Sequence, residues 1–444
     1  MLKNSPYLIK IILVTLYGMY STLFRRLPPY RKWKKYYSDL EYLTYEELLI
    51  EQRKRLLWFL KYVKNKSKFY SQIVISNSKS IEGILSSLDH VSKNDLIQKS
   101  SLLNSTKLFY HKSKTGGTTG ASLVVKYFWS DFRERMAFLD FFRERYGWRF
   151  RKKTAWFSGK SFVNENNRKK NLFWINDYFQ NIIYFSTFNI NSKTYKYYLR
   201  ELANSKVEYI VGFPSSVFLL ANFGYQNKID FFYNIKCFFP TAESITNEQK
   251  AIIQKYFNCE IRNQYASSEG APFVTECEKG NLHYEMLTGV INNISKNNNG
   301  ILVTSFTTRG FPLINYSIGD NMVFSTLECN CGRKTPLIKS IVGRTIDFIL
   351  LPSGTKVNLG NISNSTKGVK GIINFQLIQN VQNEVVLRIV VTNVYTKKDE
   401  NVFLNQLQER FDNELKITIE YVNDIPLAQS GKYQLIVNNL NGKQ

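Results

Sequence analysis

Residues 154–320 alternate between short apolar runs and longer stretches in which apolar residues recur at helical spacing. The runs have the length of buried strands, and the longer stretches have the length of helices. These segments are, in order, 154–157, 182–185, 207–211, 215–223, 235–239 and 247–256. Because parallel strands need long crossover connections, the alternation predicts βαβ units and a mostly parallel sheet through this region.

Local signals predict three further elements before and within this region. Thr44 and Glu47 have the spacing of a capping box and precede apolar residues at helical spacing, which predicts a helix over 44–65. A second helix is predicted over 130–146, and its expected core face consists of Phe132, Met136, Leu139 and Phe142. The polar segment 296–300 separates two apolar runs, which predicts a β-hairpin.

The pattern changes after residue 344. Two adjacent strands, a helix and an alternating strand are predicted at 371–379, 384–392, 401–415 and 417–422. About 100 residues can form a separate core, so we expect a small α+β domain. The sequence therefore predicts an α/β protein in three parts: an N-terminal segment at 1–36, a large domain with mixed or parallel sheets and helices at 37–342, and a small C-terminal domain at 343–444.

A Gly/Thr-rich segment, KTGGTTGAS, occupies residues 114–122, ahead of an apolar run that predicts a strand. Successive backbone amides in a glycine-rich turn form an anion-binding concavity, and threonine hydroxyls add donors for phosphate oxygens. Ala121 follows Gly120, so the segment lacks the Gly-Lys-Ser/Thr ending of a P-loop. On its own the segment is compatible with a phosphate-binding turn and equally with a flexible surface turn.

The charge of the chain is strongly positive, with 60 basic and 35 acidic residues and a net charge of +25. Lys, Asn, Ile, Tyr and Phe are all abundant and no nucleic-acid-binding module is found, so we attribute most of the charge to composition and expect no nucleic-acid partner. Five cysteines, an odd number, argue against a disulfide framework and favour a reducing, cytoplasmic location.

The N-terminal segment is a local exception to this interpretation of the charge. Residues 7–24 are mostly apolar, and residues 1–36 carry eight basic residues and no acidic one. An apolar helix followed by a cationic run is typical of a segment at a membrane surface. A helix that packs on the protein's own core explains the pattern equally well. The sequence leaves both peripheral membrane contact and packing open, and it does not define the oligomeric state.

Five further motifs follow the Gly/Thr-rich segment in a fixed order. They are PTAES at 240–244, QYASSEG at 264–270, YSIGD at 316–320, GRTID at 343–347 and PLAQSGKYQ at 426–434. This series resembles the adenylate-forming superfamily, in particular its phenylacetate–CoA ligase branch and the CapK-like subgroup associated with capsular polysaccharide biosynthesis. The resemblance covers essentially the whole chain and implies a large AMP-binding domain followed by a small domain that carries a catalytic lysine.

The resemblance also implies roles for individual residues. The phosphate-binding residues would be Thr115, Gly116, Gly117, Thr118, Thr119 and Gly120. The remaining nucleotide-binding residues would be Ala242, Glu243 and Tyr265 around the adenine, Asp320 on the ribose, and Arg344 near the domain junction. Glu269 would bind Mg²⁺, and Lys432 would approach the α-phosphate from the small domain. Ile346 stands where many relatives have a hinge Asp, which leaves rotation of the small domain open.

A second set of residues has the composition of a metal site. Cys277 and His283 are six residues apart, and Cys329 and Cys331 form a Cys-x-Cys pair. One histidine and three cysteines complete a tetrahedral zinc set, and by the resemblance these positions match zinc ligands of some CapK-like relatives. The alternative is that the four residues are unrelated.

The resemblance implies an ATP- and Mg²⁺-dependent enzyme that converts a small carboxylate to an acyl-adenylate. The acyl group would then pass to CoA, a carrier or a saccharide acceptor, with capsular polysaccharide biosynthesis as the setting. The alternative is a catalytically inactive member that binds nucleotide or acts as a scaffold in a polysaccharide-assembly complex. The identity of the carboxylate is not predicted.

Overall fold

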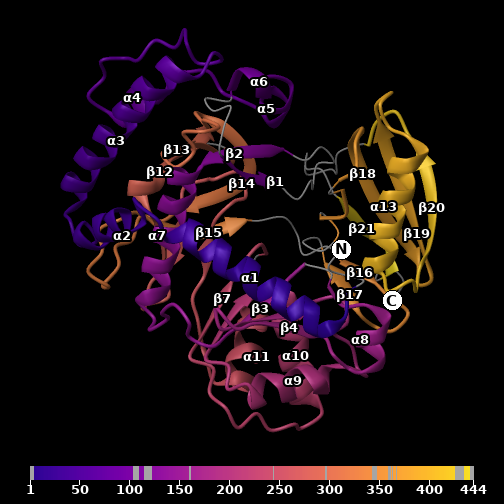
Figure 1. Ribbon diagram of the computed structural model, residues 1–444. Coiled ribbons are helices and arrows are strands. Elements are labelled where there is room, and N and C mark those ends of the chain that lie inside the picture. Colours follow the sequence, from indigo (N-terminus) through magenta and orange to yellow (C-terminus); the bar gives the residue numbers. More distant parts are fainter. Residues whose placement is uncertain are drawn as a thin grey trace.

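The chain forms a large body and a smaller C-terminal body, which lie side by side in the computed structural model (Figure 1). The structure describes residues 5–103, 110–114, 123–159, 162–243, 245–295, 298–342, 348–358, 362, 364–366, 368–425 and 435–440. Two extensive apolar cores lie in the large body, and a third lies within residues 349–436. This arrangement agrees with the predicted α/β fold with a small C-terminal α+β domain.

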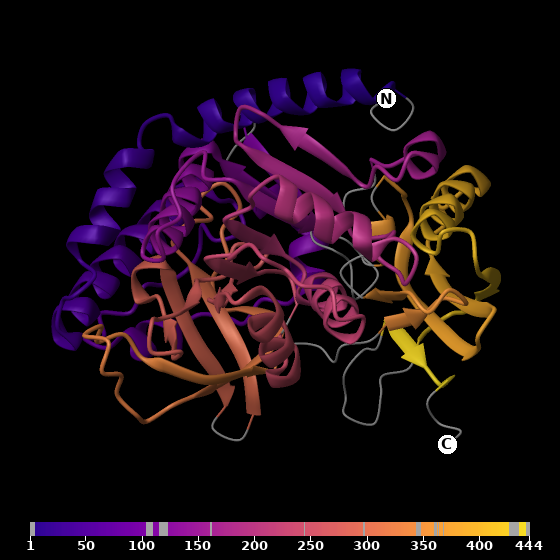
Figure 2. The same cartoon turned by 90° about the horizontal axis from the view of Figure 1, so that it is seen from below.

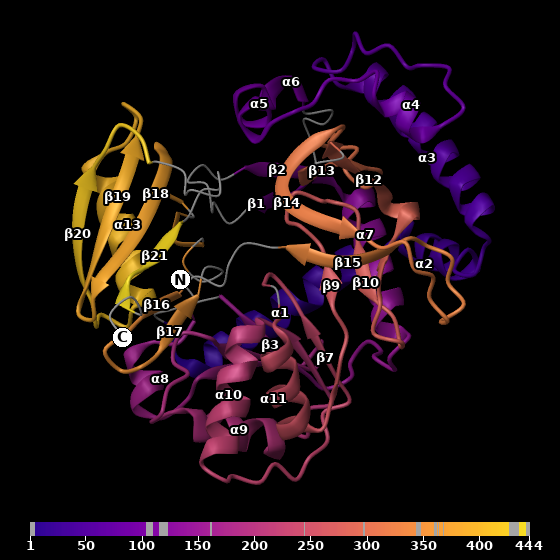
Figure 3. The same ribbon diagram turned by 180° about the vertical axis from the view of Figure 1, so that it is seen from behind.

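The first sheet of the large body has six strands in the order β4-β5-β3-β6-β7-β8, and only the β4–β5 pair is antiparallel. Its strands are β3 (Thr154–Ser158), β4 (Trp174–Asp177), β5 (Ile182–Ser186), β6 (Tyr209–Gly212), β7 (Cys237–Pro240) and β8 (Glu260–Ile261). The helices α9 (Tyr195–Asn204), α10 (Pro214–Gln226) and α11 (Asn247–Phe257) gather at this sheet (Figure 3). The predicted alternation is confirmed up to residue 261.

Both faces of this sheet are buried, as the continuous apolar sequence of its strands requires. Ile210 and Phe238 point into the core shared with α9–α11. The next residues along the strands, Val211 and Phe239, point into the other core. There Phe239 contacts Phe142 of α7 (Trp129–Glu144), with ring centroids 5.9 Å apart. The sheet is therefore enclosed between α9–α11 and α7.

The second sheet begins at residue 264 and is antiparallel throughout, in the order β12-β13-β14-β15-β11-β10-β9. Its strands are β9 (Gln264–Tyr265), β10 (Val274–Glu276), β11 (Leu282–Tyr284), β12 (Gly289–Ser295), β13 (Asn298–Ser305), β14 (Tyr316–Phe324) and β15 (Leu337–Val342). The hairpin prediction is confirmed by β12 and β13. The prediction of a mostly parallel sheet is wrong beyond β8, because turns and loops rather than crossover helices connect these strands.

The small body contains a four-stranded sheet in the order β20-β19-β18-β21 and a two-stranded hairpin. Its elements are β16 (Phe348–Leu350), β17 (Lys356–Asn358), β18 (Ile372–Val381), β19 (Glu384–Val391), α13 (Lys397–Arg410), β20 (Lys416–Tyr421) and β21 (Ile436–Asn438). Phe403 and Leu407 of α13 pack in the core with Phe375 and other residues of the sheet. The helix begins four residues before the predicted start because Thr396 and Asp399 form a capping box.

The remaining helices surround the large body (Figure 1). They are α1 (Tyr7–Arg26), α2 (Tyr30–Asp39), α3 (Tyr45–Lys66), α4 (Ile81–Leu85), α5 (Lys93–Gln98), α6 (Ser100–Leu103) and α8 (Glu165–Lys169), and a hairpin of β1 (Tyr110–Lys114) and β2 (Val124–Phe128) precedes α7. The predicted capping box of Thr44 and Glu47 is present at the start of α3.

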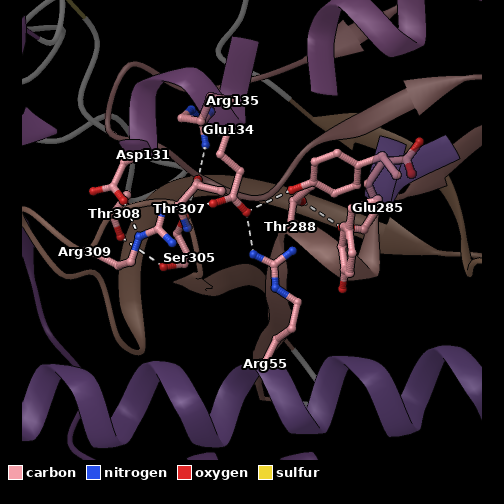
Figure 4. A network of polar contacts seen from close by, with 12 residues as sticks. Arg55, Asp131, Glu134, Arg135, Glu285, Thr288, Ser305, Thr307, Thr308 and Arg309 are labelled. Atoms are coloured by element: carbon pink, nitrogen blue, oxygen red, sulfur yellow. Dashed lines mark hydrogen bonds and ion pairs between the residues drawn. The ribbon is translucent and has the colours of Figure 1, made fainter. Parts of the chain in front are cut away.

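The core face of α7 differs from the prediction because it buries charged side chains. Asp131 and Glu134 have no exposed surface, whereas Phe132 is only partly buried. Arg309 forms ion pairs with both carboxylates. Its Nη2 lies 2.8 Å from Glu134 Oε2, and its Nε contacts Asp131 Oδ1. Arg55 of α3 forms a second ion pair with Glu134 (Figure 4). The four charges balance one another, so α7 can turn this face inward.

Replacing Arg309 with Met should strongly destabilise the protein, because Asp131 and Glu134 would keep their burial and lose a shared partner. We expect the free energy of unfolding to fall by about 3–5 kcal/mol. The control is Lys236→Met, which removes an exposed partner of Glu208 and should cost less than about 1 kcal/mol. Urea denaturation of both variants checks the difference, and equal losses would contradict the role given to the buried cluster.

Candidate functional site

Two of the predicted nucleotide-binding residues meet in the structure. The Tyr265 hydroxyl donates a hydrogen bond to Asp320 Oδ2 over 2.7 Å, although the two residues are 55 positions apart. Tyr265 ends β9, the strand at one edge of the second sheet. Asp320 lies in β14, which three strands separate from β9 in the sheet order. Both residues are half-buried, so the pair combines an aromatic ring and an oriented carboxylate that a ligand can reach.

A bulge in β14 places Asp320. The register of β13 and β14 pairs Leu302 with Ser317 but Gly300 with Asn321, so β14 contains two extra residues. Gly319 within this bulge has φ +83°, a conformation that favours glycine. Bulges change the direction of a side chain and are common next to binding sites. The Ile-Gly-Asp sequence therefore explains why this carboxylate leaves the regular pattern of the sheet.

Glu269 lies in the loop that follows Tyr265, and several contacts fix the shape of this loop. Ser267 Oγ accepts hydrogen bonds from the amides of Gly270 and Ala271, at 3.1 and 2.9 Å. Arg135, which is buried next to the charged cluster of α7, donates to the carbonyls of the same two residues at 2.9 and 3.1 Å. A side chain at Gly270 would collide with Thr308 and Tyr127. Glu269 is thus carried by a rigid turn.

The β1–β2 hairpin brings the flanks of the Gly/Thr-rich segment to this turn. Lys114 pairs with Val124 across the hairpin, and the Tyr127 hydroxyl donates to the Ser268 carbonyl over 3.0 Å. Burial raises the pKa of Tyr127, the charge of Arg135 opposes this effect, and the negative charge of Glu269 adds to it. The strand that follows the predicted phosphate-binding segment therefore contacts the loop of Glu269.

Ala242 and Glu243 lie at the carboxyl end of β7, at an edge of the parallel sheet where ligands commonly bind. Phe157 pairs with Gly212, and Gly212 pairs with Pro240, so β3, β6 and β7 end together. Glu243 Oε2 accepts a hydrogen bond from the Ser215 amide over 3.2 Å. Among the described residues, the buried Glu243 Oε1 has no hydrogen-bond partner.

Several predicted site residues lie outside the described residues. They are Thr115, Gly116, Gly117, Thr118, Thr119, Gly120, Arg344 and Lys432. Their roles stay predictions.

The structure brings the four predicted zinc ligands together. Their ligand atoms all lie within 4.8 Å of one another. Two sulfurs bound to a tetrahedral zinc ion at 2.3 Å are about 3.8 Å apart, and a sulfur and an imidazole nitrogen are about 3.5 Å apart. The observed separations are 3.7 Å between the Cys277 and Cys329 sulfurs and 3.4 Å between Cys331 Sγ and His283 Nε2. The arrangement therefore fits a zinc ion.

Neighbouring polar groups orient these ligands. His283 Nδ1 lies 2.9 Å from the Thr335 hydroxyl, which leaves Nε2 directed at the sulfurs. Asn281 Nδ2 donates to the Cys329 sulfur over 3.1 Å. Cys277 and His283 flank the β10–β11 turn, whereas Cys329 and Cys331 lie in the segment between β14 and β15. A metal here would join the β10–β11 turn to the β14–β15 segment of the second sheet.

Sequence reasoning missed the residues that support the site, namely Arg135, Ser267, Tyr127 and Ser215. A signal was present for Arg135, because a charge lies on the apolar stripe of the α7 sequence. The other three act through backbone contacts, which leave no pattern in the sequence.

Comparisons with known proteins agree with this architecture. A family model described as the CapK C-terminal domain matches residues 349–439. Protein CapK from Staphylococcus aureus is 30% identical over 452 residues, which covers 99% of this chain and 98% of that protein. A structure of 2-hydroxyisobutyryl-CoA ligase in complex with 2-HIB-AMP and CoA, in the thioesterification state, has a TM-score of 0.59 and 17% identity and covers 90% of this chain and 91% of that chain. The same ligase in the postadenylation state has a TM-score of 0.56 and 15% identity, with 90% and 92% covered.

The fold is that of the adenylate-forming ligases, with the small domain at the C-terminus. Within that class, the chain belongs to the CapK family.

Replacing Glu243 with Gln should change how stability depends on pH. Burial raises the pKa of the Glu243 carboxyl from 4.5 to about 7, against the opposing effect of its hydrogen bond with Ser215. Between pH 4.5 and about pH 7, Glu243 keeps its proton in the folded protein but loses it in the unfolded chain. The wild type therefore loses stability as the pH rises through this range.

Glu243→Gln removes this loss, which is on the order of 1–3 kcal/mol. The difference in melting temperature between the variant and the wild type, variant minus wild type, should therefore be larger at pH 8 than at pH 5. Thermal denaturation at both values checks the prediction, and a pH-independent difference would show that Glu243 does not titrate in this range.

Proposed function

We propose that this protein activates a small carboxylate with ATP, forms an acyl-adenylate, and transfers the acyl group to CoA or another acceptor. The observation that carries the proposal is the 2.7 Å hydrogen bond between Tyr265 and Asp320. It joins the two motifs that by resemblance bind the adenine and the ribose. Membership of the CapK family and the fold of adenylate-forming ligases support the proposal.

Asp320 would bind the ribose of ATP. A carboxylate only accepts hydrogen bonds, and the two ribose hydroxyls are donors. The Tyr265 hydroxyl occupies one oxygen, Oδ2, which fixes the plane of the carboxylate before a ligand arrives. The Tyr265 ring would lie against the adenine, opposite Ala242 and Glu243.

Glu269 would hold Mg²⁺ beside the phosphates. Mg²⁺ prefers oxygen ligands, and when bound it neutralises phosphate charge. The contacts of Ser267 and Arg135 with Gly270 fix the turn that carries the Glu269 backbone. The Tyr127 contact connects this turn to the hairpin that carries residues 115–120, which would bind the β- and γ-phosphates through backbone amides and hydroxyls.

Lys432 would complete the site from the small domain. In the reaction a carboxylate oxygen attacks the α-phosphorus and pyrophosphate leaves. Both reactants are anionic, so an ammonium at the α-phosphate stabilises the charge that reorganises in the transition state. Arg344 would contribute near the domain junction.

The carboxylate would bind at the edge where β3, β6 and β7 end, near Phe157, Gly212 and Thr241. Thr241 donates its amide to the Gly212 carbonyl over 2.9 Å, which fixes this edge. CoA is proposed as the acceptor because the similar 2-hydroxyisobutyryl-CoA ligase was solved in complex with CoA. A carrier or saccharide acceptor is compatible with the same first step. A role in capsular polysaccharide biosynthesis rests on the relationship to CapK.

The test is pyrophosphate release from ATP and Mg²⁺ with a library of carboxylates. We expect at least one carboxylate to stimulate release, and Asp320→Asn should lower the rate at limiting ATP by roughly 10- to 100-fold, since a charged hydrogen-bond acceptor is lost. Asp89→Asn, which changes an exposed carboxylate, is the control and should act as the wild type does. Equal rates for Asp320→Asn and the wild type would remove Asp320 from the site.

We also propose that Cys277, His283, Cys329 and Cys331 hold a structural zinc ion. Purified protein should contain about one zinc per chain, and Cys329→Ser should lose the metal and unfold at a lower temperature. The control is Cys259→Ser, a buried thiol outside the cluster, which should retain the metal. Metal analysis by mass spectrometry measures this, and zinc-free folded protein would contradict the assignment.

A further inference from the structure

The first helix, α1, buries polar or small residues and leaves most of its large apolar residues exposed, although Ile11 and Val14 pack partly against the core. Helices of soluble proteins bury an apolar stripe and expose their polar face. The buried residues of α1 are Lys10, Gly18, Ser21 and Thr22. Its exposed residues include Leu8, Ile9, Ile12, Leu13, Leu16, Tyr17, Met19, Tyr20 and Leu23, with exposed fractions from 39% to 73%. The helix therefore presents a continuous apolar face to the outside.

Specific contacts hold the polar face of α1 on the large body. Lys10 Nζ donates to the Phe162 carbonyl at 3.0 Å and to Asn167 Oδ1 at 2.9 Å. The Tyr7 hydroxyl donates to the Trp174 carbonyl at 3.0 Å. A side chain at Gly18 would collide with the Asp177 carboxylate. These contacts run along the helix, which explains why it lies flat and forms the outer edge of the molecule in Figure 2.

These contacts decide between spanning a membrane and lying on one. By length and composition α1 could cross a bilayer. Crossing would separate Lys10 from its buried partners and place its ammonium in the hydrocarbon, which is costly. A helix that lies in the plane of the membrane keeps every one of these contacts and still buries its outer face in lipid.

Positive charge accompanies the apolar face. Residues 1–36 contain eight basic residues and no acidic one. Arg25 and Arg26 end α1, and Arg31 and Lys32 follow at the exposed start of α2. Arg26, Lys34 and Lys35 form ion pairs with carboxylates of the protein, whereas Arg31 and Lys32 are exposed. An apolar face together with these exposed cations matches the surface of a membrane that contains anionic lipids. A second copy of this chain would bring the same positive charges together, so it fits the face less well.

We propose that α1 is an in-plane membrane anchor. Its outer face enters the boundary between headgroups and acyl chains of an anionic bilayer, while Arg31 and Lys32 contact the headgroups. The inference is independent of the proposed reaction.

The experiment is co-sedimentation of the full-length protein with phosphatidylcholine vesicles, with and without phosphatidylglycerol. We expect binding to the anionic vesicles and weaker binding at high salt. Replacing both Ile12 and Leu16 with Ser should reduce binding about tenfold or more, since two exposed aliphatic side chains no longer enter the lipid. Phe232→Ser is the control, because Phe232 is 91% exposed elsewhere on the protein.

Unchanged melting temperatures would show that these surface variants fold. The charge variant Arg31→Glu with Lys32→Glu should weaken binding to anionic vesicles and flatten its salt dependence. Wild-type protein that stays in the supernatant, or equal loss with Phe232→Ser, would overturn the proposal. So would a stable dimer in sedimentation velocity that Ile12→Ser with Leu16→Ser dissociates, because the face would then cover a second copy.

Discussion

The buried ion cluster of α7 is the constraint on which the large body depends. Asp131 and Glu134 are buried against Arg309 and Arg55, which reach them from the second sheet's β13–β14 connection and from α3. The neighbouring Arg135 uses the same buried position to hold the carbonyls of Gly270 and Ala271. The charges that pack α7 against the second sheet thus also position the loop of Glu269.

The candidate site draws its residues from two different sheets. The antiparallel sheet supplies Tyr265 from its edge strand and Asp320 from a bulge, and the parallel sheet supplies Glu243 at the end of β7. Each sheet is fixed by its own apolar core. Such support allows a site to be rigid although its residues come from distant parts of the sequence.

The order of the motifs and the resemblance it carries were enough to predict the fold class and the small C-terminal domain, and the structure brings Tyr265 and Asp320 of two of these motifs into contact. The face that a helix buries was less predictable. Asp131 pairs with Arg309, 178 residues further along the chain. Lys10 of α1 can be buried because it donates to Asn167, which lies 157 residues further along. The antiparallel sheet was missed for a similar reason, since short apolar strands carry no sign of their partners.

Calorimetric titration of the protein with ATP and Mg²⁺ tests most directly whether Tyr265 and Asp320 form part of a nucleotide site. We expect one ATP bound per chain and clearly weaker binding by Asp320→Ala. Absence of ATP binding by folded wild-type protein, or equal affinity of the wild type and Asp320→Ala, would contradict this expectation. The first of these results would favour a scaffold in place of an enzyme.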